Sequence, residues 1–367
     1  MNKFLKIISS LLLILLFETS ISYSQETKIK IGVLVPLSGE NAFLGKQILN
    51  SIRMALIDIK NNDIEIYPKD TMSDPDMTLR SALEFEQMGI SLVIGPIFHE
   101  NLLFLDRVKN ITFLSLTNKT LDLHKNIISS GINSSSQLNT IKKFLKENEI
   151  KKTIFLIPNL NYDLEIKKGI EESKIKFFKQ YNYDIDPTKL TKQIEKITNY
   201  GIRKQNLLDE ILRVENTDDP NKEKIIENLE KKYTLGNVKF DSVIITDFDE
   251  SLKSVITSLL YTDVSPKNKY IITLNQWFDE SLLKEQNLQP IYYPSINKKN
   301  LDEFTNKFFK KFSYKPNYLS LLSYDLVGLI YYLSLKNEAS EINKSFKTQN
   351  TFKGKIGVFE IKDNKIN

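Results

Sequence analysis

Short extended apolar segments alternate with helical segments along most of the chain, and this alternation constrains the fold more than any other feature. In the first part, the expected strands cover residues 28–37, 64–67, 91–95 and 111–116, and the expected helices cover 45–59, 77–88 and 101–109. The helices show apolar residues every three to four positions, and the strands are short apolar runs. Strands separated by helices pair in parallel, so this part predicts a doubly wound parallel sheet with helices on both faces.

A second set of the same kind follows. Its expected strands cover 153–157, 175–181, 242–246 and 270–274, and its expected helices cover 137–148, 164–172 and 250–261. Between its second and third strands lies a charged segment, about 188–236, with two amphipathic helices that break near 218–220. Two further helices, 301–312 and 319–335, precede a C-terminal hairpin at 354–366. The sequence therefore predicts an α/β protein of two parallel-sheet lobes, the second of which carries a helical insertion.

The N-terminus has the pattern of a secretory signal peptide. Two lysines precede an apolar run, 7–17, and Ser22 and Ser24 supply the small residues of a cleavage site before Gln25. The run is shorter than the roughly 20 residues that a bilayer span needs. We therefore expect cleavage of residues 1–24 and export to a periplasm; the alternative is an uncleaved N-terminal anchor.

The composition excludes several classes of function. The chain has no cysteine, which rules out disulfides, thiolate metal sites, iron–sulfur clusters, cysteine nucleophiles and the lipid anchor of a lipoprotein. Its only histidines are His99 and His124, so we expect no metal and no other cofactor. The net charge of +5 is too small to indicate nucleic acid binding. No transmembrane segment is expected after the signal peptide, because the most apolar stretch, 319–335, contains three serines and an aspartate.

Motifs of the common enzyme classes are missing from the sequence. It contains no phosphate-binding glycine loop, no nucleophile elbow and no H-E-x-x-H. Two unconnected histidines do not assemble a nucleophile–base pair, so a hydrolase is disfavoured, although carboxylate chemistry stays open. Asp247, Asp249 and Glu250 fit the solvated start of a helix better than a cation site. We expect a protein that is not an enzyme.

Residues just beyond the expected carboxyl ends of strands form the candidate ligand site, because ligands of open parallel sheets bind there. These residues are Ser38, Phe98, His99, Thr117, Asn118, Phe248 and Trp277. For His99, the alternative is a structural or solvated histidine. Trp277, the only tryptophan, either stacks on a ligand or covers the core between the lobes.

These segments also carry a family resemblance. Residues 31–39 (Ile-Gly-Val-Leu-Val-Pro-Leu-Ser-Gly), 93–96 and 113–118 resemble the first strands and ligand loops of type I periplasmic binding proteins, the leucine/isoleucine/valine-binding family. The charged insertion and the segment after it, 235–241, are similar to those of the penicillin-binding protein activators of alphaproteobacteria. So are Gln276-Trp277 and Ser323-Tyr324-Asp325.

The resemblance implies two lobes that are joined by a three-crossover hinge and close over a cleft. Lobe one would comprise about 28–140 and 297–335, and lobe two about 141–296 and 336–367. The helical insertion, about 188–236, would belong to lobe two.

The chain also departs from the amino acid receptors of that family. Where those receptors hold the ligand carboxylate with small hydroxyl residues, this chain has Phe98, His99 and Glu100, although Thr117 matches a hydroxyl position in the next loop. No acid stands at 275–277 to pair with the ligand ammonium. A buried ammonium without a carboxylate partner is costly, so we expect weak binding of standard amino acids.

Two functions follow from these features. The leading hypothesis is a non-catalytic periplasmic protein that resembles penicillin-binding protein activators and contacts a cell-wall synthase or a wall-related ligand. The alternative is the solute-binding receptor of an ABC transporter for an amino acid or similar small polar molecule, with an ABC permease as its partner. Both functions use closure of the two lobes.

Overall fold

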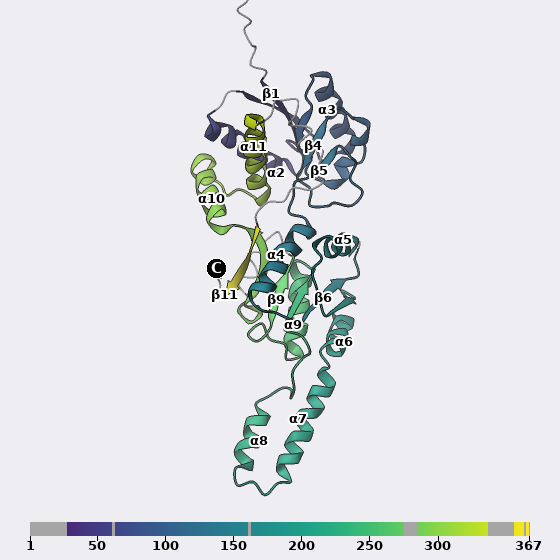
Figure 1. Ribbon diagram of the computed structural model, residues 1–367, viewed down its shortest axis with the longest axis vertical. Coiled ribbons are helices and arrows are strands. Elements are labelled where there is room, and N and C mark those ends of the chain that lie inside the picture. Colours follow the sequence, from purple (N-terminus) through teal and green to yellow (C-terminus); the bar gives the residue numbers. More distant parts are fainter. Residues whose placement is uncertain are drawn as a thin grey trace, which may run out of the picture.

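The computed structural model describes residues 28–60, 63–160, 163–274, 285–336, 356–362 and 365–366. Two lobes stack along the long axis of the molecule, and a helical hairpin extends from the far end of the second lobe (Figure 1). The expected signal segment, 1–24, and Trp277 lie outside the described residues.

Lobe one is built on a sheet of five parallel strands, in the order β2-β1-β3-β4-β5. The strands are β1 (Ile29–Val35), β2 (Ile64–Asp70), β3 (Leu92–Ile94), β4 (Thr112–Ser115) and β5 (Ile127–Ser129). Helices α2 (Ala42–Ile59) and α11 (Tyr318–Lys336) cover one face, and α3 (Pro75–Gln87) covers the other. Side chains of β1 alternate between the two faces: Ile31 and Val33 pack with α2 and α11, and Leu34 packs with Phe85 of α3. Burial of both faces explains why β1 is an almost continuous apolar run.

Lobe two contains five parallel strands and two antiparallel ones, in the order β12-β11-β10-β9-β8-β6-β7. The strands are β6 (Thr153–Pro158), β7 (Lys179–Tyr183), β8 (Ser242–Ile245), β9 (Tyr270–Thr273), β10 (Ile291–Ile296), β11 (Ile356–Lys362) and β12 (Lys365–Ile366). The antiparallel pair β11–β12 is the expected C-terminal hairpin.

Four helices cover the second sheet. They are α4 (Ser134–Glu147) and α5 (Asp163–Ser173) on one face, and α6 (Pro187–Ile197) and α9 (Asp249–Tyr261) on the other. Leu138 and Leu145 of α4 pack in one cluster with β6, so the predicted lobe boundary after residue 140 falls inside a continuous helix. The two-lobe α/β architecture that the sequence predicts is confirmed, and the residue boundaries of the lobes stay a prediction.

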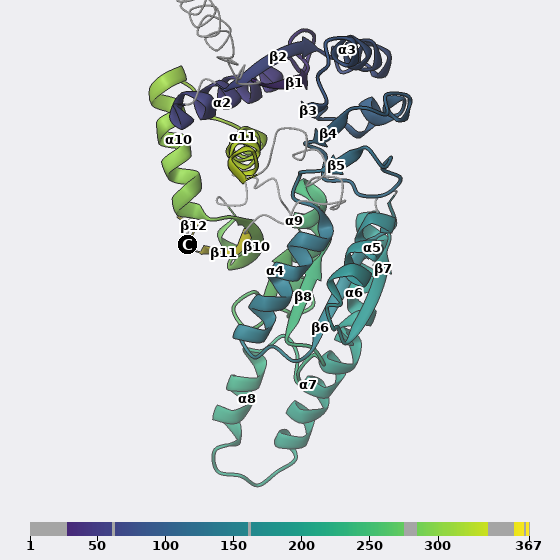
Figure 2. The ribbon, with the colours of Figure 1, turned by 45° about the horizontal axis from the view of Figure 1, so that its top comes forward.

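The insertion holds three helices rather than the two expected. Leu190 and Ile194 of α6 are buried against lobe two, so α6 belongs to the core of that lobe. The remaining two, α7 (Tyr200–Glu215) and α8 (Lys222–Glu230), form the hairpin that projects from the lobe (Figure 2). A small apolar cluster around Leu207, Val214 and Leu229 holds these two helices together.

Three other expectations need correction. Residues 101–109, expected as an α-helix, form two 3-10 turns, η2 (His99–Leu102) and η3 (Leu105–Arg107). The buried residues Asn101, Leu102, Leu105 and Val108 fit the spacing of an α-helix as well as that of 3-10 turns, so the apolar pattern does not separate the two. Strands β5 and β10 were not expected at all.

Two helices near the C-terminus contact helix α2 of lobe one. Asp58 of α2 accepts a hydrogen bond from the Tyr324 hydroxyl of α11 at 2.6 Å and pairs with Lys307 of α10 (Lys298–Phe312). Of the phenylalanines of α10, Phe304 and Phe308 are buried, but Phe309 is 52% exposed.

Helix α11 is long and apolar enough to cross a membrane by length and composition alone. In the structure it packs against α2 and the sheet of lobe one, with Val327 and Ile330 fully buried. Ser320 and Ser323 are also buried, and their hydroxyls are hydrogen bonded within the protein. These contacts are those of a core helix.

Candidate functional site

A cavity of about 650 Å³ opens at the carboxyl edge of the lobe-one sheet, within the usual size range of small-molecule sites. The loops after β1 to β5 and the start of α11 form its wall. Its lining residues are Asn41, Leu44, Ser73, Ile97, Phe98, His99, Glu100, Leu116, Thr117, Asn118, Lys119, Gly131, Ile132, Tyr318, Leu319 and Leu322. Most of this wall is apolar, and its formal charges come from Glu100 and Lys119.

Four of the seven predicted site residues meet in this wall: Phe98, His99, Thr117 and Asn118. The other two described ones lie elsewhere. Ser38 does not line the cavity; it interacts with the Asp70 carboxylate, which also accepts hydrogen bonds from the backbone of Leu37 and Met72. These hydrogen bonds hold the pKa of Asp70 below its usual range, although its burial acts in the opposite direction. Ser38 and Asp70 therefore join the loops after β1 and β2.

Phe248 begins α9 in lobe two and is not part of the cavity wall. The neighbouring Asp247 does not reach the cavity either. Its carboxylate is buried inside lobe two, where it accepts hydrogen bonds from the Tyr183 hydroxyl at 2.6 Å, from Ser251 at 2.5 Å and from the Phe248 backbone at 2.9 Å. Asp247 is thus a structural acid, and it does not supply an anion to the described wall of the cavity.

The loop after β3 carries Phe98 and His99 into the wall. It turns at Gly95, whose φ of +100° and close approach to the Leu34 carbonyl leave no room for a Cβ atom. The Ser115 hydroxyl donates to the Pro96 carbonyl at 2.8 Å and ties this loop to the end of β4. Phe98 packs against the apolar core beneath the sheet. The backbone therefore fixes the position of both side chains.

The surroundings of His99 favour the neutral form of its imidazole. Burial lowers its pKa below the ordinary value, and the positive charge of Lys119 lowers it further. Its Nδ1 atom is buried and has no hydrogen-bond partner among the described residues. A ligand in the cavity could therefore use His99 as a neutral donor or acceptor.

The loop after β4 supplies Thr117, Asn118 and Lys119. The Thr117 hydroxyl oxygen accepts a hydrogen bond from the Lys119 backbone N–H at 3.2 Å, which leaves its own proton available for a ligand. The Thr117 carbonyl accepts from the Ser129 hydroxyl at 2.7 Å and from the Gly131 N–H at 3.1 Å. Lys119 has no carboxylate within 4 Å in the part of the chain that the structure describes. This loop can therefore offer a hydroxyl and an unpaired ammonium group.

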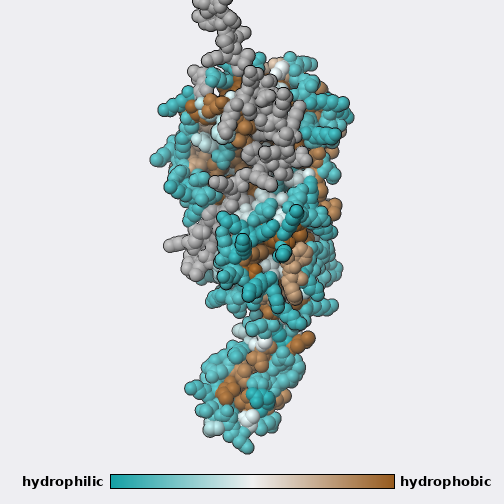
Figure 3. All heavy atoms as spheres, in the orientation of Figure 1, coloured by the Kyte–Doolittle hydropathy of each residue, from teal (hydrophilic) through white to brown (hydrophobic). Residues whose placement is uncertain are grey.

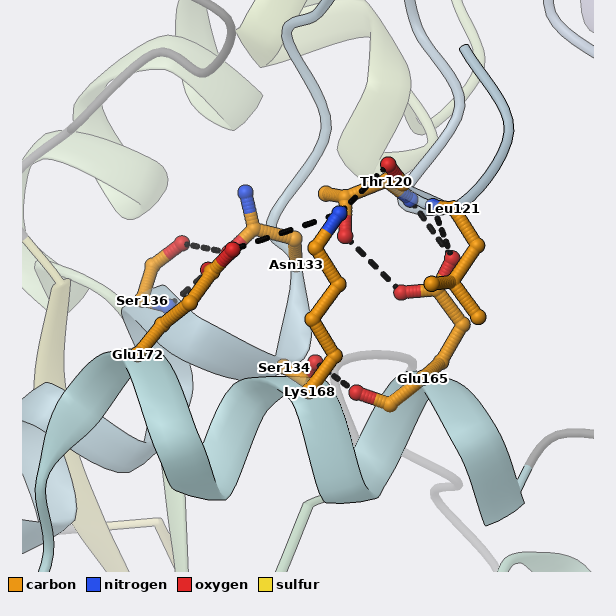
Figure 4. Close-up of polar contacts among 8 residues, drawn as sticks. All are labelled: Thr120, Leu121, Asn133, Ser134, Ser136, Glu165, Lys168 and Glu172. Carbon is orange, nitrogen blue, oxygen red and sulfur yellow. Dashed lines mark hydrogen bonds and ion pairs between the residues drawn. The ribbon is translucent and has the colours of Figure 1, made fainter.

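The same loop is bonded to lobe two by Glu165 of α5 (Figure 4). The Glu165 carboxylate accepts hydrogen bonds from the Thr120 N–H at 2.6 Å, the Leu121 N–H at 2.7 Å and the Thr120 hydroxyl at 2.9 Å. Lys168, one turn further along α5, donates to the Thr120 carbonyl at 2.8 Å. Every polar group of Thr120 is therefore held by α5, which links a wall of the cavity in lobe one to a helix of lobe two.

Close packing of α4 and α5 supports this contact. Gly169 faces Ser134 so closely that an added Cβ would lie 2.5 Å from the serine hydroxyl. That hydroxyl donates to the Glu165 carbonyl at 2.8 Å. The helix that carries Glu165 is thereby fixed to the start of α4, which follows the chain crossover from lobe one.

The predicted site did not include the other residues of the cavity wall, which are Asn41, Leu44, Ser73, Ile97, Glu100, Leu116, Lys119, Gly131, Ile132 and the residues of α11. Asn41 and Ser73 belong to loops at the expected edge of the sheet, and Leu44 lies in the first turn of α2, so a wider choice of residues from these segments would have included them. Tyr318, Leu319 and Leu322 had no local signal, because α11 reaches the site from about 200 residues further along the chain than the other wall residues. No group of three or more metal-ligating side chains was found in the described residues.

Comparison with known proteins supports this fold. A family model described as "Periplasmic binding protein" matches residues 28–202. The isoleucine complex of the branched-chain amino acid transporter substrate-binding protein LivJ from Streptococcus pneumoniae is 15% identical, with a TM-score of 0.52 over 93% of this chain and 98% of that one. No curated protein matches the chain by sequence.

Two other solved structures resemble the chain more closely in shape. The C-domain of LpoA from Haemophilus influenzae, a regulator of PBP1A, is 13% identical, with a TM-score of 0.59 over 92% of this chain and 98% of that one. An ABC-type branched-chain amino acid transporter protein from Rhodopseudomonas palustris is also 13% identical, with a TM-score of 0.63 over 92% of both chains. The chain therefore has the type I periplasmic binding protein fold, which transporter receptors and a regulator share.

Proposed function

We propose that the protein is a non-catalytic periplasmic regulator of a cell-wall synthase, which it contacts through the α7–α8 hairpin. The observation that carries this proposal is the hairpin itself, which projects from lobe two at the end opposite lobe one (Figure 1). Its resemblance to the insertion of penicillin-binding protein activators and the similarity of the whole fold to the LpoA C-domain support the same function. The predicted signal peptide would deliver the protein to the periplasm.

The hairpin leaves large apolar side chains in solvent. Leu208 and Leu212, one turn apart on α7, are 47% and 55% exposed, and Ile202 near the start of the helix is 65% exposed. Tyr233, just after α8, is 77% exposed. Figure 3 shows apolar surface on the hairpin with hydrophilic surface around it. Leu208 and Leu212 share one face of α7, and adjacent exposed apolar side chains of this kind are typical of protein contact surfaces.

The base of the hairpin is rigid, as a docking element requires. Arg203 is buried at the start of α7, where it donates to the Thr198 carbonyl, to the Thr234 hydroxyl and to the Thr262 carbonyl. Thr234 in turn donates to Asp263 at 2.6 Å. A buried arginine with all these acceptors ties both ends of the hairpin to the end of α9. The hairpin is therefore held at a defined angle to lobe two.

A solute receptor of an ABC transporter is the second candidate, and the cavity favours it. Its volume of about 650 Å³ suits an amino acid or similar small molecule. In the described wall, however, the only acid is Glu100, which is exposed on the lobe-one side. An α-amino acid needs a buried anion for its ammonium group, and this wall is poorly suited to provide one.

Binding to a purified class A penicillin-binding protein of the same organism tests the first candidate. We expect the double variant Leu208→Asp/Leu212→Asp to lose most of its affinity in biolayer interferometry, because two charges enter the apolar contact. Leu83→Asp on α3, an exposed leucine of lobe one, is the matched control and should bind like the wild type. Equal binding by all three proteins would show that the hairpin is not the contact surface.

A further inference from the structure

We propose that lobe two carries a second binding site, which takes a small multivalent oxyanion such as a polyphosphate or a polycarboxylate. The site lies toward the amino ends of β6, β7 and β8, next to the point where α7 leaves the lobe (Figure 1). The cavity described above lies instead at the carboxyl edge of the lobe-one sheet. This second site does not depend on the proposed function.

Three lysines from three separate elements converge on this second cavity, which measures about 510 Å³. Lys179 begins β7, Lys196 lies in the last turn of α6, and Lys239 precedes β8. No aspartate or glutamate is among the described residues that line it. A concave surface with three cations and no anion concentrates positive potential and favours a ligand with several negative charges.

The three lysines share a lack of nearby counter-charges. None of the three has a carboxylate within 4 Å in the described chain, whereas Lys189 on the same helix α6 pairs with Asp184 at 3.0 Å. The local sequence therefore provides acids near α6, but the fold directs them away from the cavity. An oxyanion bound in this cavity would accept charge-assisted hydrogen bonds from ammonium groups that have no carboxylate partner.

The rest of the wall also matches an oxyanion. The Gln193 side-chain oxygen accepts a hydrogen bond from the Asp184 N–H at 2.9 Å, so its amide hydrogens remain as donors on the same wall. Asn199 adds a second amide. Lys179 lies over the Tyr181 ring, with its Nζ atom 5.0 Å from the ring centroid, which restrains the ammonium group at the cavity. Ammonium and amide groups together form a donor-rich site.

The size of the cavity limits the ligand to a small molecule. A volume of about 510 Å³ lies in the usual range of about 300–1,000 Å³ for small-ligand sites. Three separated lysines suit a ligand with two or more anionic groups better than a single carboxylate, which one lysine would satisfy. We therefore test tripolyphosphate and citrate, which carry the same chemistry on phosphate and carboxylate groups.

Titration calorimetry with these two probes tests the site at ionic strengths of about 20 mM and about 150 mM. The site variant is Lys179→Ala/Lys196→Ala/Lys239→Ala. The control variant removes three exposed lysines of the hairpin, Lys204→Ala/Lys222→Ala/Lys224→Ala, and so has the same net charge. We expect the site variant to lose at least about tenfold in affinity and the control to change less than about twofold. Circular dichroism and thermal unfolding of both variants would verify their folding.

Each outcome bears on the proposal. Selective loss in the site variant supports it, and the tighter of the two probes then identifies phosphate or carboxylate as the preferred group. Equal losses in the two triple variants would mean that only the net charge attracts the anions, which overturns the site. Absence of binding to the wild type at the lower ionic strength overturns it as well. If the site variant does not fold, the single charge reversal Lys196→Glu replaces it in the comparison with the wild type and makes a smaller change to the protein.

Discussion

Replacement of Glu165 by alanine should release the cavity loop from lobe two. The change removes the acceptor of three hydrogen bonds, from the two backbone amides of Thr120 and Leu121 and from the Thr120 hydroxyl. Thr120 is 9% exposed, so its groups are poorly placed to find water without a movement of the loop. We therefore expect the loop to detach from α5 in the variant.

The magnitude follows from the number and type of these bonds. A hydrogen bond to a charged group contributes about 1.5–3 kcal/mol, and bonds to one shared acceptor are not additive. Glu165 itself is half-buried, so water replaces part of the loss. We expect a net cost of about 2–3 kcal/mol for attachment of the loop, which is a factor of about 30 to 150 in its attached population.

Amide hydrogen exchange at Thr120 and Leu121 measures this change directly. Exchange through local opening should accelerate by the same factor in Glu165→Ala, while the core strands keep their protection. Glu165→Gln retains one acceptor oxygen without the charge and should fall between the wild type and the alanine variant. Glu171→Ala, which removes an exposed acid from the same helix, is the control.

A second measurement tests whether the hydrogen bonds of Glu165 also limit the movement of the two lobes relative to each other. Pulsed electron paramagnetic resonance with one spin label on α3 and one on α9 should give a broader distance distribution in Glu165→Ala than in Glu171→Ala. Unchanged exchange at the two amides in Glu165→Ala would refute the reasoning, because the carboxylate would then not be what holds the loop.

Three further predictions use other parts of the molecule. Leucine, isoleucine and valine should bind weakly or not at all to refolded, ligand-free protein in calorimetry, and a micromolar dissociation constant would promote the transporter receptor to first place. Deletion of residues 200–235 with a short linker should preserve cooperative unfolding, whereas deletion of 188–236 should abolish it, because the second also removes Leu190 and Ile194 from the core. The folded-state pKa of His99 lies below its ordinary value of about 6.5. As the pH falls below about 6.5, His99 therefore takes up a proton in the unfolded chain before it does so in the folded protein, and the free energy of unfolding decreases. The slope of unfolding free energy against pH should therefore be smaller in His99→Gln below about pH 6.5, and identical slopes would contradict the assignment of a depressed pKa.

The sequence by itself was sufficient to predict the two-lobe architecture, because the apolar periodicity that indicates strands and helices is a local property. In β1, Ile31 and Leu34 pack on opposite faces of the sheet, and the continuous apolar run already indicated a strand covered on both sides. Strands β5 and β10 were the exceptions. Strand β5 has only three residues, too few for a pattern, and β10 contains Pro294, which argues against an internal strand.

The candidate site was only partly predictable for a different reason. Strand ends and loops are defined locally, so the sequence is enough to assign Phe98, His99, Thr117 and Asn118 to one edge of a sheet. Whether a strand-end residue faces a cavity depends on its partners. Ser38 instead interacts with Asp70 in the neighbouring loop, and the apolar periodicity of the sequence does not predict this contact.

Tertiary structure alone decided which distant segments meet. Leu319 of α11 joins the cavity wall, and Glu165 of α5 accepts hydrogen bonds from the loop after β4. Lys179, Lys196 and Lys239 line a second cavity whose described residues include no acid. Each of these arrangements joins residues that are tens to hundreds of positions apart in the chain. Their proximity is set by the packing of helices on sheets and by the relative placement of the lobes, and a local pattern carries no information about either.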